Sequence, residues 1–366
     1  MKTRTFTLII GSLFLLLSIP TSAQLNLPRG SQMATITQRV GITDISITYS
    51  RPGVRGREIW GQLVPYGMTN PGFGTATSAP WRAGANENTT IEFTHDVKVE
   101  GQDIKAGIYG LHIEVKENGG ATIILSNNSS SWGSFFYDEK EDALRAEVMT
   151  KEAPHHELLT FEFNTIDATS TVASLIWGEK EIPFKIEVPV SKIVITDIKE
   201  RLRSTPGFSR QSWEQAANFA LNNGGDLNEA MQWIDNAIAG QFYSQKTVNN
   251  LSIKAAILDK MGRRNEGAKL IDEAAAMANK NQLNALGYLM LNTYKDNDRA
   301  LKFFKMNVKN NPEDPNMYDS LGEAYKIIGD KRNAIKNLKK ALSMNPPANV
   351  RANSVRLLKE LGVDAE

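Results

Sequence analysis

The sequence predicts two domains of different class, an all-β domain of sandwich or jelly-roll-like architecture followed by an all-α domain built as a solenoid. From residue 34 to residue 190, apolar and polar residues alternate in short runs, which is typical of half-buried antiparallel strands. After Pro189 the apolar residues recur at about the helical period, and several of them recur again one repeat further along. The length of 366 residues allows two domains, each with its own core.

The composition excludes several classes of protein. The chain has no cysteine, which rules out thiol catalysis, thiolate metal sites, disulfides and a lipid-modified cysteine. The 42 Lys+Arg and 41 Asp+Glu residues give a net charge of +1, which argues against a nucleic-acid-binding chain. The charges are unevenly divided, because residues 24–190 hold 14 basic and 21 acidic residues whereas residues 191–366 hold 26 and 20.

The N-terminus has the pattern of a secretory leader. Lys2 and Arg4 precede an apolar run from Thr7 to Ile19, and small residues follow up to Ala23. A membrane anchor needs about 20 apolar residues, and this run is shorter. We therefore expect a signal peptide over residues 1–23, cleaved after Ala23, and a periplasmic or secreted chain without a membrane span.

About eight or nine short strands are expected in the first domain, residues 24–190. A hairpin is indicated where Glu117–Gly120 separates two apolar runs, because Asn-Gly-Gly supplies the positive φ values of a tight turn. The expected strands lie at Ile42–Tyr49, Thr90–Phe93, Val97–Val99, Tyr109–Val115, Thr122–Leu125, Leu144–Val148, Leu158–Phe163, Thr171–Trp177 and Phe184–Val188.

The second domain contains helical repeats. Ala300 and Phe304 recur as Ala334 and Leu338, a displacement of about 34 residues. The last unit resembles the tetratricopeptide repeat at all eight of that family's framework positions, which are Tyr318, Leu321, Gly322, Tyr325, Ala334, Leu338, Ala341 and Pro346. We expect a linker helix at 191–210, repeats over 211–347 and a capping helix with the tail at 348–366. An ordinary helical bundle is the alternative.

The earlier repeats fit this framework less well. At a constant spacing Tyr288 falls where glycine is usual, and Asn307 falls where alanine is usual. Two further units, around Leu251 and Leu221, fit with a deletion or only loosely. These weaker units are still needed, because such repeats bury a continuous core only when about three or more stack.

A block in the first domain carries a second resemblance. The sequence Y-S-R-P-G-V-R-G-R-E-I-W-G-Q-L-V-P-Y-G starts at Tyr49, and W-R-A-G-A-N-E-N-T-T-I-E-F starts at Trp81. Together with K-A-G-I-Y-G-L from Lys105 and S-W-G from Ser131, it resembles the secreted bacterial family DUF2911, a domain of unknown function. The resemblance implies a β fold and brings no activity. Residues 68–80 form an insertion, which we expect to be a flap.

Arginine and tryptophan residues gather in the loops of this block. Turn glycines and prolines could bring them together at one end of the domain. Arginine presents a planar fork to carboxylate or phosphate, and tryptophan presents a flat face to a sugar. One interpretation is an anion or glycan pocket; the other is a structural network in which Arg57 or Arg82 pairs with Glu87 while the indoles fill the core. The candidate ligand-binding residues are Arg51, Arg57, Trp60, Trp81, Arg82, Asn86 and Glu87.

No catalytic or metal-binding motif is found. His112 and Glu114 would share one face of a strand, but a third ligand is not evident, and His155-His156-Glu157 lacks helical metal-binding spacing. No G-x-S-x-G elbow and no phosphate-binding glycine loop are present. We therefore name no catalytic residue, no metal site and no cofactor.

The first helices of the tetratricopeptide-like units should line a polar groove suited to a protein or peptide partner. The candidate partner-binding residues are Gln282, Leu289, Asn292, Asn316, Asp319, Glu323 and Lys326. The leading hypothesis is an exported, non-enzymatic binding protein, whose repeats dock a partner and whose β domain presents an anion or glycan site. The alternative is an envelope- or glycan-directed hydrolase or lyase with its site in the Arg/Trp-rich loops.

Overall fold

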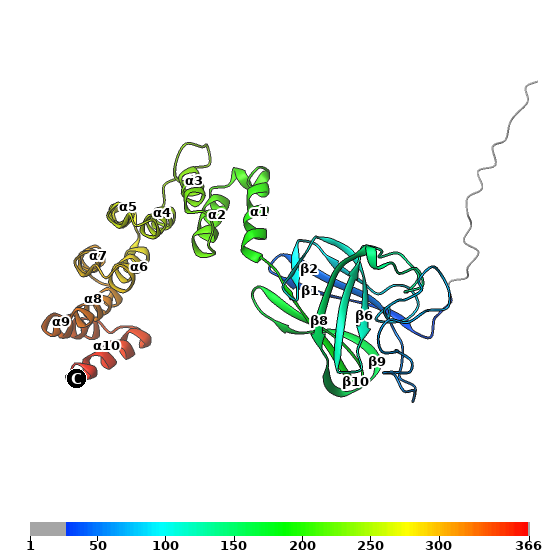
Figure 1. The fold of residues 1–366 in the computed structure, drawn as a ribbon. Coiled ribbons are helices and arrows are strands. Elements are labelled where there is room, and N and C mark those ends of the chain that lie inside the picture. Colours follow the sequence, from blue (N-terminus) through cyan, green and yellow to red (C-terminus); the bar gives the residue numbers. More distant parts are fainter. Residues whose placement is uncertain (1–26, 365–366) are drawn as a thin grey trace, which may run out of the picture. The chain divides into compact units, whose positions relative to one another are not determined.

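The computed structural model describes residues 27–364, so the expected signal peptide, residues 1–23, lies outside the described part of the chain. The chain forms two compact units, one built around Asp44–Glu187 and one around Val188–Glu366. The first consists of strands and the second of helices (Figure 1). The expected fold class, an antiparallel β domain followed by a tetratricopeptide-type helical region, is confirmed.

The β domain consists of two sheets, whose pairings from β2 onward are antiparallel. Their apolar faces bury Ile45, Ile91 and Leu111 from one sheet and Phe161 and Phe184 from the other. The six-stranded sheet has the order β1 (Gln32–Val40), β2 (Thr43–Arg51), β3 (Thr90–Phe93), β6 (Gly107–Val115), β7 (Gly120–Ser126), β8 (Asp142–Met149). The four-stranded sheet has the order β5 (Gln102–Ile104), β4 (Val97–Val99), β10 (Ser170–Glu187), β9 (Lys151–Ile166).

The strands follow the alternation in the sequence, with one notable difference. The β6–β7 hairpin turns at Gly119, whose φ of 85° is the positive value that the Asn-Gly-Gly sequence predicted. The segments Thr171–Trp177 and Phe184–Val188, expected as separate strands, largely fall within the single 18-residue strand β10. Register shifts on both sides of Gly178 interrupt the pairing of β10 with β9, so the strand bends there without ending.

The helical unit is a series of two-helix repeats. A side chain caps the N-terminus of several of these helices, as Asp226, Thr247 and Asn279 do for the helices that begin directly after them. The elements are α1 (Val190–Arg201), the 3-10 turn η2 (Thr205–Phe208), α2 (Arg210–Asn222), α3 (Leu227–Ile238), α4 (Val248–Lys260), α5 (Arg264–Met277), α6 (Lys280–Leu289), the π-helical turn η3 (Met290–Tyr294), α7 (Asn297–Asn310), α8 (Pro315–Ile328), α9 (Lys331–Ser343) and α10 (Ala348–Glu360).

Within a repeat, a small residue on the first helix faces a large one on the second. A Cβ on Gly322 of α8 would lie 2.7 Å from Cγ of Leu338 on α9. The same arrangement occurs in the preceding repeat, where a Cβ on Gly287 would lie 2.7 Å from Cζ of Phe304. Gly287, and not Tyr288, therefore holds the glycine position, so the constant-spacing alignment was off by one residue.

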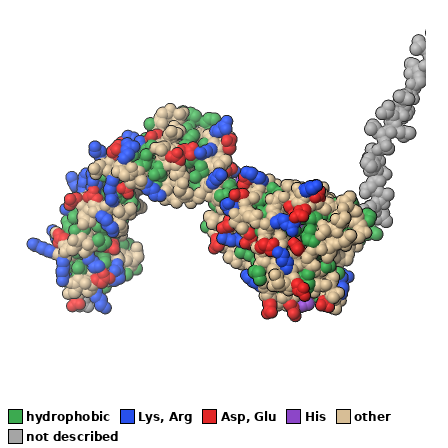
Figure 2. Space-filling model, viewed as in Figure 1, with side chains coloured by type: hydrophobic (Ala, Val, Ile, Leu, Met, Phe, Trp, Pro, Cys, Tyr) green, Lys and Arg blue, Asp and Glu red, His purple; other side chains and the backbone are tan. Residues whose placement is uncertain are grey.

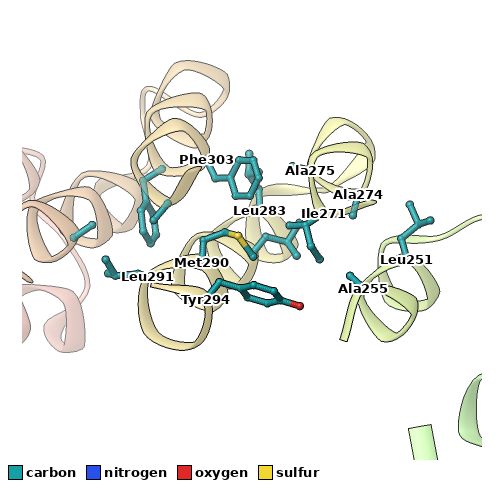
Figure 3. Packing of buried hydrophobic residues seen from close by; sticks show 14 of the residues in the cluster. Leu251, Ala255, Ile271, Ala274, Ala275, Leu283, Met290, Leu291, Tyr294 and Phe303 are labelled. Atoms are coloured by element: carbon teal, nitrogen blue, oxygen red, sulfur yellow. The ribbon is translucent and has the colours of Figure 1, made fainter. Parts of the chain in front are cut away.

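The π-helical turn explains that offset. Met290–Tyr294 adopts i to i+5 geometry, which accommodates one additional residue without breaking the helix. The insertion lies between Gly287 and Ala300, so both can occupy their framework positions. Figure 3 shows Met290 and Leu283 directed toward Ile271 of α5, all within one buried cluster.

Substitution of Gly287 by Ala tests this close approach. The new methyl group would overlap the fully buried Phe304 ring, which costs about 1–3 kcal/mol, while alanine returns up to about 1 kcal/mol of helix propensity. We expect a net loss of about 1–2 kcal/mol in urea unfolding of the full chain followed by helical circular dichroism.

The matched control is the same substitution in a Phe304→Ala background, where no long side chain reaches the glycine. There the Gly287→Ala change should cost little or become stabilising, because the two sites couple. An equal loss in both backgrounds would show that the glycine is not required by Phe304.

Candidate functional site

The candidate site lies in the loops that follow β2 and β7 of the β domain. The long β2–β3 loop is fixed to the sheet where β3 has ended, because Trp81 pairs with Ile113 of β6 through two backbone hydrogen bonds of 3.1 and 2.8 Å. Its inserted segment pairs with itself at Thr69 and Ala79. The expected flap at 68–80 is thereby tied down, and Arg82 is held beside the sheet.

Arg82 is a half-buried cation held on three sides. Its Nη1 donates to the carbonyl of Asn86 at 2.6 Å, and its guanidinium carbon lies 5.0 Å from the centre of the Phe135 ring. A Cβ on Gly133 would overlap the guanidinium, and Gly133 has a φ of 62° that favours glycine. Burial lowers the pKa of Arg82, and no carboxylate among residues 27–364 forms an ion pair with it.

A pocket of about 120 Å³ opens beside this guanidinium. Arg82 is the one charged residue in its wall, Ser134 and Thr69 contribute hydroxyl groups, and apolar side chains make up most of the remainder. The lining residues are Pro65, Gly67, Thr69, Pro71, Ala79, Pro80, Trp81, Arg82 and Ser134.

Ser134 connects the pocket to a buried histidine. His112 Nδ1 and Ser134 Oγ are 3.0 Å apart, and both residues are buried. Burial and the nearby Arg82 charge lower the pKa of His112 to about 4, so the imidazole is neutral at pH 7. A base of such low pKa accepts a proton weakly, and no carboxylate among the described residues hydrogen-bonds to this ring to strengthen it.

A second buried network closes the far side of His112. The Tyr137 ring meets the imidazole edge-on at 5.6 Å, and its hydroxyl donates to Asp142 at 2.7 Å. Arg145 donates to the same carboxylate oxygen at 3.0 Å and pairs with Glu114 at 3.4 Å. Burial raises the pKa of Asp142, and the hydrogen bonds from Tyr137 and Arg145 oppose that shift. Arg145 therefore has two carboxylate partners, whereas Arg82 has none among the described residues.

The other predicted arginines do not converge on Arg82. Arg51 donates to the carbonyl of Leu159 and to Thr160 Oγ1, at 3.0 and 2.7 Å. Arg57 donates to the carbonyls of Val54 and Gly53 at 3.1 and 2.5 Å. Both therefore fasten backbone segments.

Glu87 and Asn86 stabilise the start of the described chain. Glu87 pairs with Arg29 and not with Arg57 or Arg82. The Asn86 side-chain amide donates to the backbone carbonyl of Ser31 at 3.0 Å. The backbone carbonyl of Asn86 accepts the hydrogen bond from Arg82. Of the predicted ligand-binding set, Arg82 and Trp81 are the two that line the pocket.

Three indoles of the β domain pack against one another. Trp81 stacks on the fully buried Trp177 at 5.9 Å, and Trp60 meets both rings edge-on at 5.9 and 6.2 Å. Lys180 Nζ lies 5.6 Å from the Trp60 ring centre. This packing covers much of each indole and leaves Trp81 as the aromatic wall of the pocket.

Two larger cavities in the β domain are lined in part by ion-paired side chains. One, of about 490 Å³, includes Lys116 and Glu147, which pair at 2.5 Å, and the exposed Lys151. Another of about 330 Å³ is lined by the Arg29–Glu87 pair. Neither presents an unneutralised buried cation.

In the helical unit, several predicted groove residues bond to the next repeat. Asp319 accepts from Asn353 at 2.8 Å and from Ser354 on α10, and burial raises its pKa. Glu323 accepts from Tyr288 at 2.8 Å, and Lys326 pairs with Glu360 at 2.5 Å. Each contact joins positions about one repeat apart, so these polar side chains hold the stack together.

The remaining predicted groove residues divide into two kinds. The side-chain oxygen of Gln282 accepts a hydrogen bond of 3.0 Å from the backbone N–H of Asn279, as part of a capping box. Leu289 packs against the core cluster. Asn292 is exposed and Asn316 is half-buried. Figure 2 shows acidic and basic side chains interspersed over the visible face of the helical unit.

The first repeat displays an aromatic surface that the sequence analysis did not single out. Phe208 and Phe242 are 65% and 82% exposed, and their ring centres lie 6.2 Å apart. Tyr243 stacks on Trp213 at 6.5 Å and meets Phe242 at 5.2 Å. The loop that presents Phe242 is fixed by Ser244, which donates to the carbonyl of Asn236 at 2.6 Å. We call Phe208, Trp213, Phe242 and Tyr243 the aromatic surface.

Residues 27–364 contain neither a cluster of metal ligands nor a helix of membrane-spanning character. No group of three or more histidine, aspartate or glutamate side chains there is arranged to hold a metal ion. None of the helices in that range is long and apolar enough to cross a membrane.

Two family profiles match the chain. Residues 31–186 match the family described as "Protein of unknown function (DUF2911)", and residues 315–347 match a tetratricopeptide repeat. Both resemblances were expected from the sequence and are confirmed. No curated protein matches the sequence.

Several solved structures are similar to part of the chain. MamA is 17% identical with a TM-score of 0.31, over 43% of this chain and 89% of that one. YrrB, described as a TPR protein with an unusual peptide-binding site, is 14% identical with a TM-score of 0.31, over 45% and 84%. A tetratricopeptide repeat protein from Parabacteroides merdae ATCC 43184 is 14% identical with a TM-score of 0.33, over 47% and 68%.

The low pKa of His112 predicts a specific acid sensitivity. In the unfolded chain the imidazole protonates near pH 6.5, and in the folded chain it protonates only near pH 4. The unfolded state binds more protons between these values, so stability falls as the pH drops through that window, by about 3 kcal/mol in total. The contribution is fully favourable above pH 6.5.

Urea unfolding of the full chain at pH 7 and pH 4, followed by tryptophan fluorescence, checks this expectation. The His112→Gln variant should lose about 3 kcal/mol less on acidification than the unsubstituted chain, whatever its stability at pH 7. Equal acid losses in His112→Gln and the unsubstituted chain would contradict the assignment.

Proposed function

We propose that this chain is an exported, non-enzymatic binding protein, whose β domain holds an anionic ligand at Arg82 and whose helical repeats hold a polypeptide partner. The observation that carries the proposal is a half-buried guanidinium, without a carboxylate partner in residues 27–364, in the wall of a pocket of about 120 Å³.

The energetics of burial support an anion at this position. Removing a cation from water is costly unless an opposite charge or several hydrogen bonds compensate for it. Arg82 has one hydrogen bond to a carbonyl and one aromatic contact, so most of its donors have no protein acceptor. A bound anion would supply the missing charge and acceptors. By contrast, Arg145 meets Asp142 and Glu114 within the chain.

A glycan fits this site less well than a simple anion. Sugar recognition uses an exposed aromatic face, and the Trp60, Trp81 and Trp177 indoles cover one another. The exposed Trp132 is covered in part by Arg29, whose guanidinium carbon lies 5.3 Å from the ring centre. We therefore favour the anion over the glycan as the ligand of the β domain.

One observation favours a hydrolase as the second candidate function. Ser134 Oγ lies 3.0 Å from His112 Nδ1 beside the pocket, the arrangement of a serine nucleophile and its base. The low basicity of His112 and the lack of a carboxylate bonded to it weigh against this function. A hydrolase would lose turnover in the Ser134→Ala variant, whereas an anion-binding protein would lose only a few-fold in affinity.

The helical unit supports polypeptide binding through its aromatic surface. Large exposed aromatic side chains presented by a fixed loop are characteristic of interaction sites, because their burial against a partner is favourable. Asp319, Glu323 and Lys326 already have partners within the chain. We therefore place the main contact with the partner at Phe208 and Phe242.

Export rests on the leader alone. The basic start, apolar run and small-residue end of residues 1–23 support secretion to the periplasm or beyond. N-terminal sequencing of the protein from its native host should begin at Gln24. A mature chain that still begins at Met1 would contradict export by cleavage.

The Arg82→Gln substitution tests the anion site. It keeps hydrogen-bonding capacity and removes the charge, so binding of acetate, propionate, phosphate or sulfate to the full chain should weaken at least tenfold. Ligand-observed NMR measures the affinities, and the melting temperature checks folding. The Arg57→Gln control, from the same loop, should leave binding unchanged. Anion binding that is equal in both variants would rule out Arg82 as the site.

Photo-crosslinking in the native host tests the partner surface. A p-benzoylphenylalanine at position 242 should give discrete polypeptide adducts, because the side chain at this position is 82% exposed within the aromatic surface. The same group at Ile327 of α8, which is 53% exposed, serves as the control and should give none. Adducts at position 327 alone would move the partner site away from the first repeat.

A further inference from the structure

We propose that the Arg82 pocket selects a monocarboxylate with a small apolar body, taken either as a free short-chain acid or as the C-terminal carboxylate of a chain ending in a small residue. This inference rests on the proposed anion site and adds the class of ligand. It follows from the charge, the donors, the volume and the walls of the pocket, which are considered in turn.

The charge of the pocket favours a singly charged ligand. Arg82 is the one cation among the nine lining residues, and no lysine is among them. A monocarboxylate would be neutralised by one guanidinium, whereas a phosphate or sulfate dianion would leave a negative charge against apolar walls. The planar guanidinium fork also matches the two oxygens of a carboxylate.

Ser134 provides a second donor to the same ligand. In the neutral tautomer that carries its proton on Nδ1, His112 donates to Ser134 Oγ across the 3.0 Å hydrogen bond. The serine hydroxyl proton is then available to the carboxylate. Because His112 is neutral at pH 7, it contributes no charge of its own, and its role is to orient the serine.

The volume of the pocket limits the size of the ligand. About 120 Å³ is somewhat smaller than a cavity of about 150 Å³ that holds one benzene molecule, so a group of about five or six heavy atoms fills it. Propionate and butyrate have five and six. A hexose ring or a nucleotide is too large to be enclosed.

The walls of the pocket favour an alkyl body over a hydroxylated one. Pro65, Pro71 and Pro80 have no backbone N–H to donate, and Ala79 and Trp81 add apolar surface. Hydroxyl groups of a sugar or hydroxy acid would lose water there with few acceptors or donors in return. Burial of a short alkyl chain is favourable on the same surface.

The guanidinium is positioned before any ligand arrives. The Asn86 carbonyl fixes Nη1, the Phe135 ring covers one side, and Gly133 leaves room that a side chain would fill. A donor group that is already ordered loses little side-chain entropy on binding. The remaining donors of Arg82 can therefore act on a ligand without rearrangement of the loop.

Saturation-transfer NMR on the full chain with propionate and butyrate tests the proposal. Both acids should bind, and the Arg82→Gln variant should bind them at least tenfold more weakly. The Ser134→Ala variant should lose only a few-fold, because one neutral donor is removed. The Arg57→Gln control should match the unsubstituted chain. If Arg82→Gln fails to fold, a Pro80→Glu variant replaces it. The negative charge that this variant places in the pocket wall should likewise weaken the binding of both acids.

A second readout separates ligand contact from structural damage. A carboxylate bound at Arg82 neutralises the charge that helps to depress the pKa of His112. At pH 7, where the acid is ionised, saturating propionate should therefore shift the His112 ring proton resonances. Resonances that propionate leaves unmoved, in a chain that binds the acid, would place the acid elsewhere and overturn the proposal.

Inorganic anions and a short peptide distinguish the outcomes. Binding of phosphate or sulfate through Arg82, without binding of propionate, would overturn the monocarboxylate while leaving the anion site intact. Absence of any Arg82-dependent anion binding would overturn both. Trialanine with a free C-terminus, compared with its C-terminal amide, separates the two sources. Binding of the free acid form alone supports capture of a chain end, and binding of propionate but neither peptide supports a free acid.

Discussion

A half-buried cation without a carboxylate partner in the described part of the chain is the constraint around which the loops beside the pocket are arranged. The Arg82 guanidinium is held by a carbonyl and an aromatic ring, and Gly133 makes room for it. Nearby, the part-buried Arg145 meets two carboxylates, whereas Arg82 is paired with none among residues 27–364. Because a charge without a partner costs stability, its position beside a pocket is best explained by a ligand that completes it.

The helical unit depends on a different constraint, the close approach of paired helices. Gly287 and Gly322 admit Phe304 and Leu338, and this contact is kept although the third repeat has one additional residue. The π-helical turn at Met290–Tyr294 absorbs that residue. Polar side chains on the first helices then bond from repeat to repeat, and the partner surface that we propose lies in the first repeat.

The sequence predicted the fold class well because both periods are local properties of the chain. Alternation identified strands such as β2, and the recurrence of Ala334 and Leu338 identified the repeats. The offset at Gly287 was missed because a constant spacing cannot show a π-helical turn. The joining of two expected strands into β10 was missed because a bulge at Gly178 resembles a strand end in the sequence.

The site was only partly predictable for a geometric reason. Arg82 and Trp81 were named because they lie in an Arg/Trp-rich loop, but Ser134 and His112 come from other segments and form no sequence motif with them. Arg51, Arg57 and Glu87 share the loop composition and serve its internal contacts. Composition therefore indicated the region, and the fold determined which of its residues meet.

A crystal structure of the full chain grown with propionate tests most directly whether Arg82 binds a carboxylate. We expect a carboxylate in the pocket with its oxygens about 3 Å from the Arg82 guanidinium and Ser134 Oγ, and its alkyl end against Pro80 and Trp81. A pocket that contains only water at saturating propionate, or an Arg82 side chain turned toward a carboxylate of the chain itself, would contradict it.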